Sequence, residues 1–187
     1  MRLDRILTIP NLITFARLGL LPVLLWMLAV RRFELAFWLL VAASIGDGLD
    51  GFLARALDQR SRLGAVLDPI ADKLTILGIA WILAAETLLP VWLAVLMSLR
   101  DLVIVAGALA YRQYTGTLEM APSLLSKLNT LLEFLLLVLT IAAQIGWVGM
   151  AGWIEPALVI IAFTIVASGA QYVWVWGRKA RRHAHRH

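Results

Sequence analysis

Four aspartates at helical spacing lie in one short stretch of a chain that is otherwise strongly apolar. They form two pairs, Asp47 with Asp50 and Asp68 with Asp72. Spacings of three and four residues place the members of each pair on one face of a helix, so two antiparallel helices can present four carboxylates to one cavity. Carboxylate oxygens are the ligands that magnesium, manganese and calcium prefer. The stretch therefore predicts a site for one or two divalent cations.

The helices that position these aspartates are expected to span a membrane. The chain has 187 residues, 61% of them hydrophobic, and a mean hydropathy of +0.85, whereas the apolar share of a soluble domain is nearer half. Apolar runs of about 20 residues, the length that a bilayer requires, recur along the chain. The predicted fold is an all-α integral membrane protein, a bundle of six transmembrane helices. The predicted spans are Asn11–Val30, Glu34–Arg55, Ala65–Ala85, Pro90–Arg112, Leu124–Ile145 and Trp153–Trp176.

Two short segments flank this bundle. Residues 1–10 alternate charged and apolar side chains at helical spacing, which predicts a short amphipathic helix in the membrane interface. Residues 177–187 form a basic tail. Because no linker and no fixed-period repeat divides the chain, we expect a single membrane domain over residues 1–187, with the six-helix bundle over residues 11–176.

The distribution of basic residues predicts the orientation of the bundle. Arginine and lysine collect at the ends of alternate apolar runs, and Arg31 with Arg32 is the exception. The positive-inside rule then places both termini in the cytoplasm, with the aspartates facing it, in a bacterial-type inner (cytoplasmic) membrane. The net charge of +5 is explained by this placement, so we do not expect nucleic acid as a partner.

The residue types that are missing exclude other chemistry. Cysteine is absent, which rules out disulfides, thiol nucleophiles and cysteine-ligated zinc. The three histidines all lie in the C-terminal tail. A Ser-His-Asp triad within the bundle is therefore excluded as well.

The depth of the carboxylates favours a functional role. At 1.5 Å per residue, Asp47 and Asp50 lie roughly 12 and 7 Å inside the end of their span. A carboxylate at mid-bilayer costs about 2.5–3.5 kcal/mol. Bound cations would remove this cost together with the mutual repulsion of four like charges. The residues alone leave one alternative open, a proton or cation relay in a membrane transporter, because buried acids also mark ion pathways.

Small residues and an arginine accompany the aspartates. Gly51 and Ala54 leave the helix face beside the carboxylates bare, and Gly64 marks the turn between the two helices. Arg55 offers a guanidinium fork that suits phosphate. Carboxylates, cations, a floor of small residues and an arginine together predict a nucleotide diphosphate site.

At these positions the sequence resembles the CDP-alcohol phosphotransferase family of membrane enzymes. The family pattern is D-x-x-D-G-x-x-A-R, eight residues, then G-x-x-x-D-x-x-x-D. Every position is matched, by Asp47, Asp50, Gly51, Ala54, Arg55, Gly64, Asp68 and Asp72. Eight fixed positions at the correct spacing are far more specific than a lone glycine motif, and they strongly disfavour the transporter alternative.

The resemblance implies roles for these residues. The first three aspartates would hold two divalent cations, magnesium or manganese, that bind the CDP diphosphate; calcium is a possible substitute or inhibitory ion. Asp72 would act as general base while also touching metal. The remaining motif residues would line the nucleotide site with Asp50. The family fold is six transmembrane helices around a polar cavity open to the cytoplasm, commonly in a homodimer.

The first predicted span adds three polar residues on one helix face, Asn11, Thr14 and Arg17. They resemble the contribution of the family's first helix beside the cytidine and are secondary candidates for nucleotide binding. The alternative is a polar helix start in which Arg17 only snorkels to the interface.

The second half of the chain resembles the eukaryotic-type cardiolipin synthase branch of the family. The resemblance rests on Arg100 with Asp101, on Arg112, and on the segment APSLLSKLNT that contains Lys127. It implies transfer of a phosphatidyl group from CDP-diacylglycerol to phosphatidylglycerol, giving cardiolipin and CMP. The alternative is a phosphatidylglycerophosphate synthase, which uses glycerol 3-phosphate. Both acceptors are anionic, so Arg100, Lys127 and Arg112 are candidates to bind either one; for Lys127 an interfacial anchor is the alternative.

Overall fold

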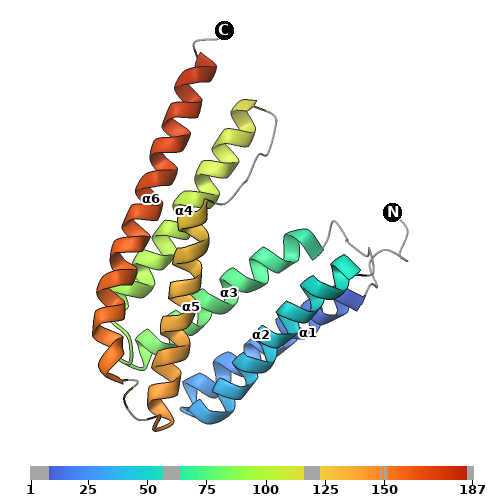
Figure 1. Ribbon diagram of the computed structural model, residues 1–187, viewed down its shortest axis with the longest axis vertical. Coiled ribbons are helices and arrows are strands. Elements are labelled where there is room, and N and C mark those ends of the chain that lie inside the picture. Colours follow the sequence, from blue (N-terminus) through green and yellow to red (C-terminus); the bar gives the residue numbers. More distant parts are fainter. Residues whose placement is uncertain (1–8, 57–63, 116–122, 148, 150, 185–187) are drawn as a thin grey trace.

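Helices make up the described part of the chain (Figure 1). The computed structural model describes residues 9–56, 64–115, 123–147, 149 and 151–184. The elements in chain order are α1 (Ile9–Ala29), α2 (Phe33–Ala56), α3 (Gly64–Ala85), α4 (Val91–Thr115), α5 (Leu124–Gln144), the 3-10 helix η2 (Ala151–Trp153) and α6 (Ile154–Ala184). No strand occurs in these ranges, so the predicted all-α fold is confirmed for them.

The observed helix ends follow the predicted apolar runs, with differences at the two termini of the bundle. α1 begins at Ile9, so Pro10 lies in its first turn, where the missing N–H group costs no hydrogen bond. α6 continues to Ala184 rather than ending at Trp176, so most of the predicted basic tail is helical. Residues 1–8, which carry nearly all of the predicted amphipathic helix, lie outside the described residues.

Three helices are long and apolar enough to cross a membrane, as judged by length and composition over the described ranges. The apolar segments are Val91–Ala108 in α4, Leu124–Gln144 in α5 and Ile154–Tyr172 in α6. The corresponding segments of α1 and α2, Phe15–Ala29 and Phe33–Gly46, are shorter. The described residues are helical, and helices of this length and apolar character indicate an integral membrane protein.

The helices form two groups that pack together at one end of the molecule. In the N-terminal group, α1 packs against both α2 and α3; in the C-terminal group, α6 packs against both α4 and α5. Contacts of α3 with α4 and α5, and of α2 with α5, join the groups. Figure 1 shows that the groups diverge toward the end where α2 and α4 finish and α3 and α5 start.

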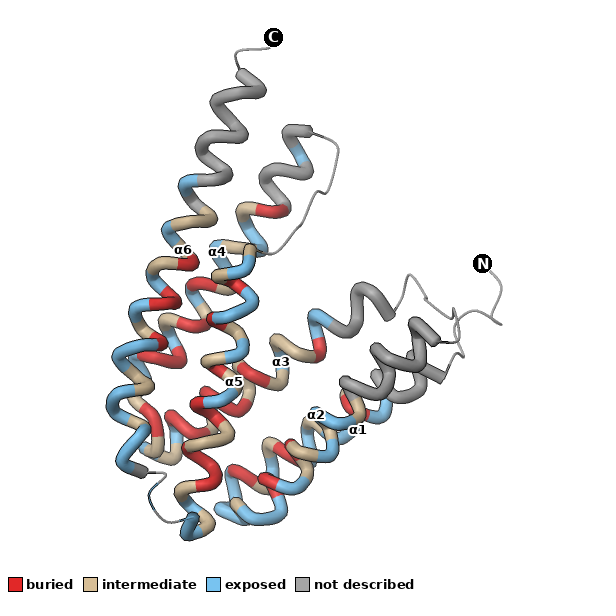
Figure 2. The backbone as a smooth tube through the Cα atoms, in the orientation of Figure 1, coloured by how far each residue is buried: buried red, intermediate tan, exposed pale blue. Residues whose placement is uncertain are grey.

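The hydrophobic core lies where the two groups meet, and Figure 2 shows buried positions concentrated there. Its largest fully buried apolar side chains come from all six α-helices: Leu28, Leu40, Ile79, Leu83, Leu93, Met97, Leu136, Leu137, Ile141, Ile161 and Ile165. Large apolar side chains such as Trp26, Leu102 and Phe163 are instead exposed on the outer helix faces. These faces suit contact with lipid chains, which removes the need to bury them.

Two helix-ending turns lie side by side at the packed end. Two residues beyond the end of α1, Arg31 has a φ of 58°, and two residues beyond the end of α3, Thr87 has a φ of 60°. In each case the N–H groups of this residue and of the next one bond back to carbonyls of the last helical turn, as in a Schellman motif. Arg31 Nε donates to Glu86 Oε2 at 2.5 Å and joins the turns. Arg31, one of the two exceptions to the charge pattern, is thus paired with a carboxylate of α3's C-terminal turn.

Candidate active site

The four aspartates lie on the two helices that were predicted to carry them. Asp47 and Asp50 are in the last part of α2, and Asp68 and Asp72 are in the first part of α3. Both helices pack against α1, and the end of α2 and the start of α3 lie at the same end of the molecule (Figure 1). The two helices therefore run antiparallel with the aspartates at the same end, and the convergence of the four carboxylates on one cavity stays a prediction.

Only part of the predicted site is described at the level of side chains. Most predicted site residues have side chains outside the described set, although the backbone of each belongs to a helix. These residues are Asn11, Thr14, Asp47, Asp50, Gly51, Ala54, Arg55, Gly64, Asp68 and Arg112. Their contacts, and the ligand set of the cations, stay predictions. Within the described side chains, no group of three or more carboxylates or histidines gathers. An all-carboxylate donor set does fit magnesium or manganese.

Asp72 is paired with an arginine from the first helix. Arg17 Nη1 on α1 donates to Asp72 Oδ1 on α3 at 2.7 Å. The Arg17 side chain is 8% exposed, whereas the Asp72 side chain is 47% exposed. A buried cation thus orients one carboxylate oxygen of a side chain that remains accessible. Arg17 contacts the predicted base, and the roles of both residues in the reaction stay predictions.

Arg100 is the centre of a buried polar cluster in the C-terminal group. Its Nη1 donates to Asp101 Oδ1 at 2.7 Å, and its Nη2 donates to Ser126 Oγ at 2.6 Å and Ser168 Oγ at 3.2 Å. Lys73 Nζ on α3 donates to the same Asp101 oxygen at 2.8 Å. The guanidinium is thus bonded to α5 and α6 as well as to its own helix, and the Arg100 side chain is 2% exposed.

A buried carboxylate extends this cluster along α5. Asn129 Nδ2 donates to Glu133 Oε1 at 2.6 Å, and Thr164 Oγ1 on α6 donates to Asn129 Oδ1 at 2.8 Å. All three side chains are buried. The Glu133 carboxyl group is thus held by a hydrogen bond inside the helix bundle, as buried polar groups require.

The sequence analysis did not single out Lys73, Glu133 or Ser168. Glu133 could have been found, because a carboxylate within a long apolar helix is by default a candidate functional residue. Lys73 directly follows Asp72, the last position of the aspartate motif, and is not itself part of that motif. Ser168 gives no signal in the sequence, since a serine in an apolar helix is common. Lys127, another of the three predicted acceptor residues, is exposed near the start of α5.

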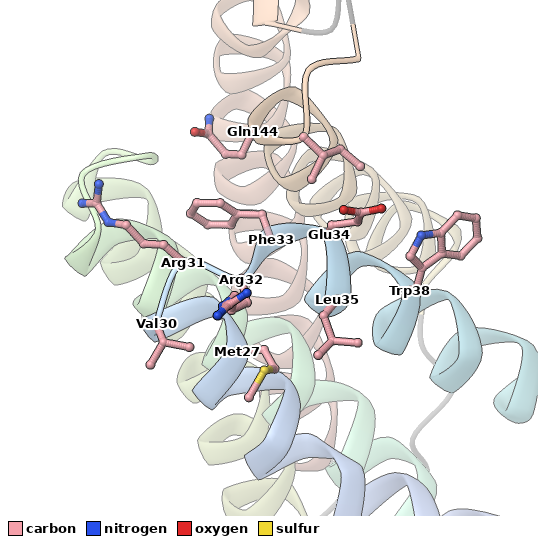
Figure 3. Close-up of a pocket in the computed structure, with 10 residues that line it drawn as sticks. Met27, Val30, Arg31, Arg32, Phe33, Glu34, Leu35, Trp38 and Gln144 are labelled. Atoms are coloured by element: carbon pink, nitrogen blue, oxygen red, sulfur yellow. The ribbon is translucent and has the colours of Figure 1, made fainter.

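A cavity of about 830 Å³ lies away from the aspartates, at the packed end of the molecule. Figure 3 shows the side chains around it, among them Arg32, Glu34, Trp38 and Gln144. Arg31 points away from the middle of this cavity, on the side of the α3–α4 turn. The cavity contains none of the predicted site residues and is not the candidate active site.

Comparison with known proteins identifies the family. The CDP-alcohol phosphatidyltransferase model matches residues 7–176. The chain belongs to the CDP-alcohol phosphatidyltransferase family. The matched range includes the whole aspartate motif and all of the buried polar cluster, so the resemblance noted from the motif is confirmed.

Several relatives are similar over most of the chain. The cardiolipin synthase (CMP-forming) of Homo sapiens is 32% identical over 92% of this chain and 62% of its own length. That of Streptomyces coelicolor is 34% identical over 80% of this chain and 77% of its own. The chloroplastic CDP-diacylglycerol–glycerol-3-phosphate 3-phosphatidyltransferase 1 of Oryza sativa is 29% identical, over 90% and 57%. The chain thus spans 62% of the human relative's length.

Proposed function

We propose that this protein transfers the phosphatidyl group of CDP-diacylglycerol to a primary hydroxyl of phosphatidylglycerol, giving cardiolipin and CMP. The observation that carries the choice of reaction is family membership over residues 7–176, which include the complete aspartate motif. The similarity to CMP-forming cardiolipin synthases from a mammal and a bacterium supports the choice of acceptor. The transporter alternative is set aside, because the family is one of transferases.

The reaction is a single in-line displacement. The acceptor hydroxyl oxygen forms a bond to the phosphatidyl phosphorus, and the bond from that phosphorus to the bridging oxygen of CMP breaks. Asp72 accepts the hydroxyl proton, and Arg17 holds Asp72 Oδ1 so that the side chain keeps its orientation. Asp50, Gly51, Ala54, Arg55 and Gly64 would bind the nucleotide diphosphate, with Asn11 and Thr14 beside the cytidine.

Divalent cations complete the proposed site. Asp47, Asp50, Asp68 and Asp72 would hold two of them, magnesium or manganese. When bound, such ions neutralise the diphosphate charge and the charge that develops on the departing CMP. Removal of divalent ions by a chelator should therefore abolish turnover.

We propose the following arrangement in the membrane. All six α-helices span the bilayer, both termini lie in the cytoplasm, and the active site faces it in a bacterial-type inner membrane. Residues 1–10 include an interfacial helix, and the protein functions as a homodimer. The alternation of helix ends between the two ends of the molecule supports this arrangement (Figure 1).

The acceptor is proposed to bind on the C-terminal group. Lys127, which is exposed near the start of α5, and Arg112, near the end of α4, would supply cations for its phosphate. Arg100 would not contact the acceptor directly, because its guanidinium is bonded to Asp101, Ser126 and Ser168. The acceptor-binding role proposed for Arg100 therefore depends on its electrostatic field or on a rearrangement of these bonds.

Glycerol 3-phosphate is the second candidate acceptor. The similarity to a plant CDP-diacylglycerol–glycerol-3-phosphate 3-phosphatidyltransferase favours it, although at lower identity. A phosphatidylglycerophosphate synthase would use the same donor and the same base. Both candidate acceptors carry a phosphate, so the cations of the C-terminal group fit either one.

The test is a reconstitution assay. The purified protein in vesicles is given CDP-diacylglycerol, manganese or magnesium, and either phosphatidylglycerol or glycerol 3-phosphate. We expect cardiolipin and CMP with phosphatidylglycerol, and no reaction after chelation. Product formation with glycerol 3-phosphate alone would establish the second candidate, and no CMP release with either acceptor would contradict the proposal.

A further inference from the structure

A chain of ion pairs connects the helix of the predicted base to the C-terminal group. Lys73 Nζ on α3 donates to Asp101 Oδ1 on α4 at 2.8 Å, and Arg100 Nη1 donates to the same oxygen at 2.7 Å. One carboxylate oxygen thus joins a cation from each group of helices. Because Arg100 is also bonded to Ser126 and Ser168, the position of Asp101 is linked to α5 and α6.

The Lys73–Asp101 pair joins the two groups of helices near the place where they diverge. The hydrophobic core extends to Ile76 in α3 and to Met97 in α4, so the pair lies one turn beyond the core on both helices. Figure 1 shows that the two groups diverge in this direction. In the described residues beyond this core, the ion pair links α3 to α4. Bilayer and protein screen such a pair less than water screens a surface pair.

The predicted base Asp72 lies beside this pair, and Arg17 on α1 also holds it. Asp72 directly precedes Lys73 on α3, so any tilt of α3 away from α4 moves both residues together. The proposed acceptor residues lie on α4 and α5. In the proposed reaction, the distance from Asp72 to the acceptor hydroxyl is then determined by how α3 is held against the C-terminal group.

We infer that Lys73 and Asp101 are positioning residues: their ion pair holds α3, and with it Asp72, at a constant distance from the helices that bind the acceptor. The expected change in kcat rests on the proposed function, whereas the expected change in the distance between the two groups of helices does not. Lys73 is the better residue to change, because its side chain is 35% exposed and its removal leaves Asp101 paired with Arg100.

The kinetic experiment compares Lys73→Met with Lys73→Arg. Methionine keeps the apolar stem and removes the charge, and arginine keeps the charge and the reach. A displacement of about 1 Å can cost about 100-fold in rate. We expect Lys73→Met to lower kcat about 10- to 100-fold with the KM for CDP-diacylglycerol changed less than about twofold, and Lys73→Arg to retain most of the wild-type kcat. Lys73→Gln is a second uncharged variant, should Lys73→Met fold poorly.

The structural experiment measures the distance between the two groups directly. The chain has no cysteine, so Val23→Cys on α1 and Val105→Cys on α4 introduce two specific sites for spin labels, and both positions are exposed. We expect Lys73→Met to shift or broaden the distance distribution and Lys73→Arg to leave it unchanged. Arg31→Gln is the matched control, because it removes the Arg31–Glu86 ion pair at the packed end of the molecule.

The two measurements separate the inference from the proposed function. A wild-type distance distribution in Lys73→Met overturns the inference whatever the activity. Equal loss of kcat in Lys73→Met and Lys73→Arg with unchanged distances also overturns it, since Lys73 would then act on the substrate itself. If the wild-type protein transfers to neither acceptor, the proposed function fails, and the distance measurement alone decides the inference.

Discussion

At the scale of single residues, the accessible Asp72 and the buried Arg17 form the best-described part of the site. The difference in their exposure matters, because a base must reach its substrate whereas the group that orients it need not. The arginine comes from α1 and the aspartate from α3, so the pair also joins two helices of the N-terminal group. A short polar contact thus serves both the geometry of the site and the packing of its scaffold.

Replacement of Asp72 tests its assignment as the base. We expect Asp72→Asn to lower kcat by about 10²- to 10⁴-fold, because an amide cannot accept the hydroxyl proton. CDP binding in the presence of manganese, measured by calorimetry in nanodiscs, should be retained. Glu155→Gln, an exposed carboxylate in the first turn of α6, is the control and should leave both quantities unchanged. Wild-type turnover in Asp72→Asn would refute the assignment.

At the scale of helices, buried polar contacts link α5 to its neighbours. Lipid chains are as apolar as leucine, so helix pairs in a membrane gain little from hydrophobic burial alone. The contact from Thr164 to Asn129 links α6 to α5, and Asn129 in turn bonds to Glu133. Loss of one donor leaves a buried acceptor without its partner, which is costly in an apolar surrounding.

The α5–α6 contact can be tested with two matched variants. Thr164→Val should lower the free energy of unfolding by about 1 kcal/mol, because membrane-buried interhelical hydrogen bonds contribute about 0.6 kcal/mol on average and up to about 1.7. Thr140→Val is the control: the hydroxyl of each threonine lies within hydrogen-bond distance of a carbonyl of its own helix, Leu136 for Thr140 and Ile161 for Thr164, and that of Thr164 also reaches Asn129 on α5. Thermal unfolding in detergent compares the two, and an equal or larger loss in Thr140→Val would contradict the expectation.

At the scale of the whole molecule, the arrangement of helix ends predicts the orientation in the membrane. Gln113, near the end of α4, and Gln144, at the end of α5, are both exposed and lie at opposite ends of the bundle (Figure 1). The charge bias places the first inside and the second outside.

Single cysteines can verify this orientation, because the chain contains none of its own. In spheroplasts treated with an impermeant maleimide, we expect labelling of Gln144→Cys and no labelling of Gln113→Cys until the membrane is opened. The charge bias supplies the physical reason, since basic segments are retained on the cytoplasmic side. The reverse labelling pattern would show that the active site faces outward.

The local features of this protein follow from its sequence. The apolar runs determine the helices, because the backbone in lipid can pair its polar groups only within a helix or a closed barrel. The spacing of Asp47, Asp50, Asp68 and Asp72 predicts which helix faces carry the site, and the complete motif points to the family that the match over residues 7–176 shows. These features depend on residues close together in the chain, which is why periodicity and spacing suffice to find them.

The pairing of distant residues was decided only by the tertiary structure. Arg17 and Asp72 are 55 positions apart, and Arg100 and Ser168 are 68 apart. Whether Arg100 is buried against Asp101 or open to an acceptor depends on how α4, α5 and α6 pack, and each arrangement would satisfy the same local pattern. The sequence by itself determined the helices and the aspartate motif; helix packing determined which charges neutralise one another, because that choice depends on contacts between helices that no local spacing encodes.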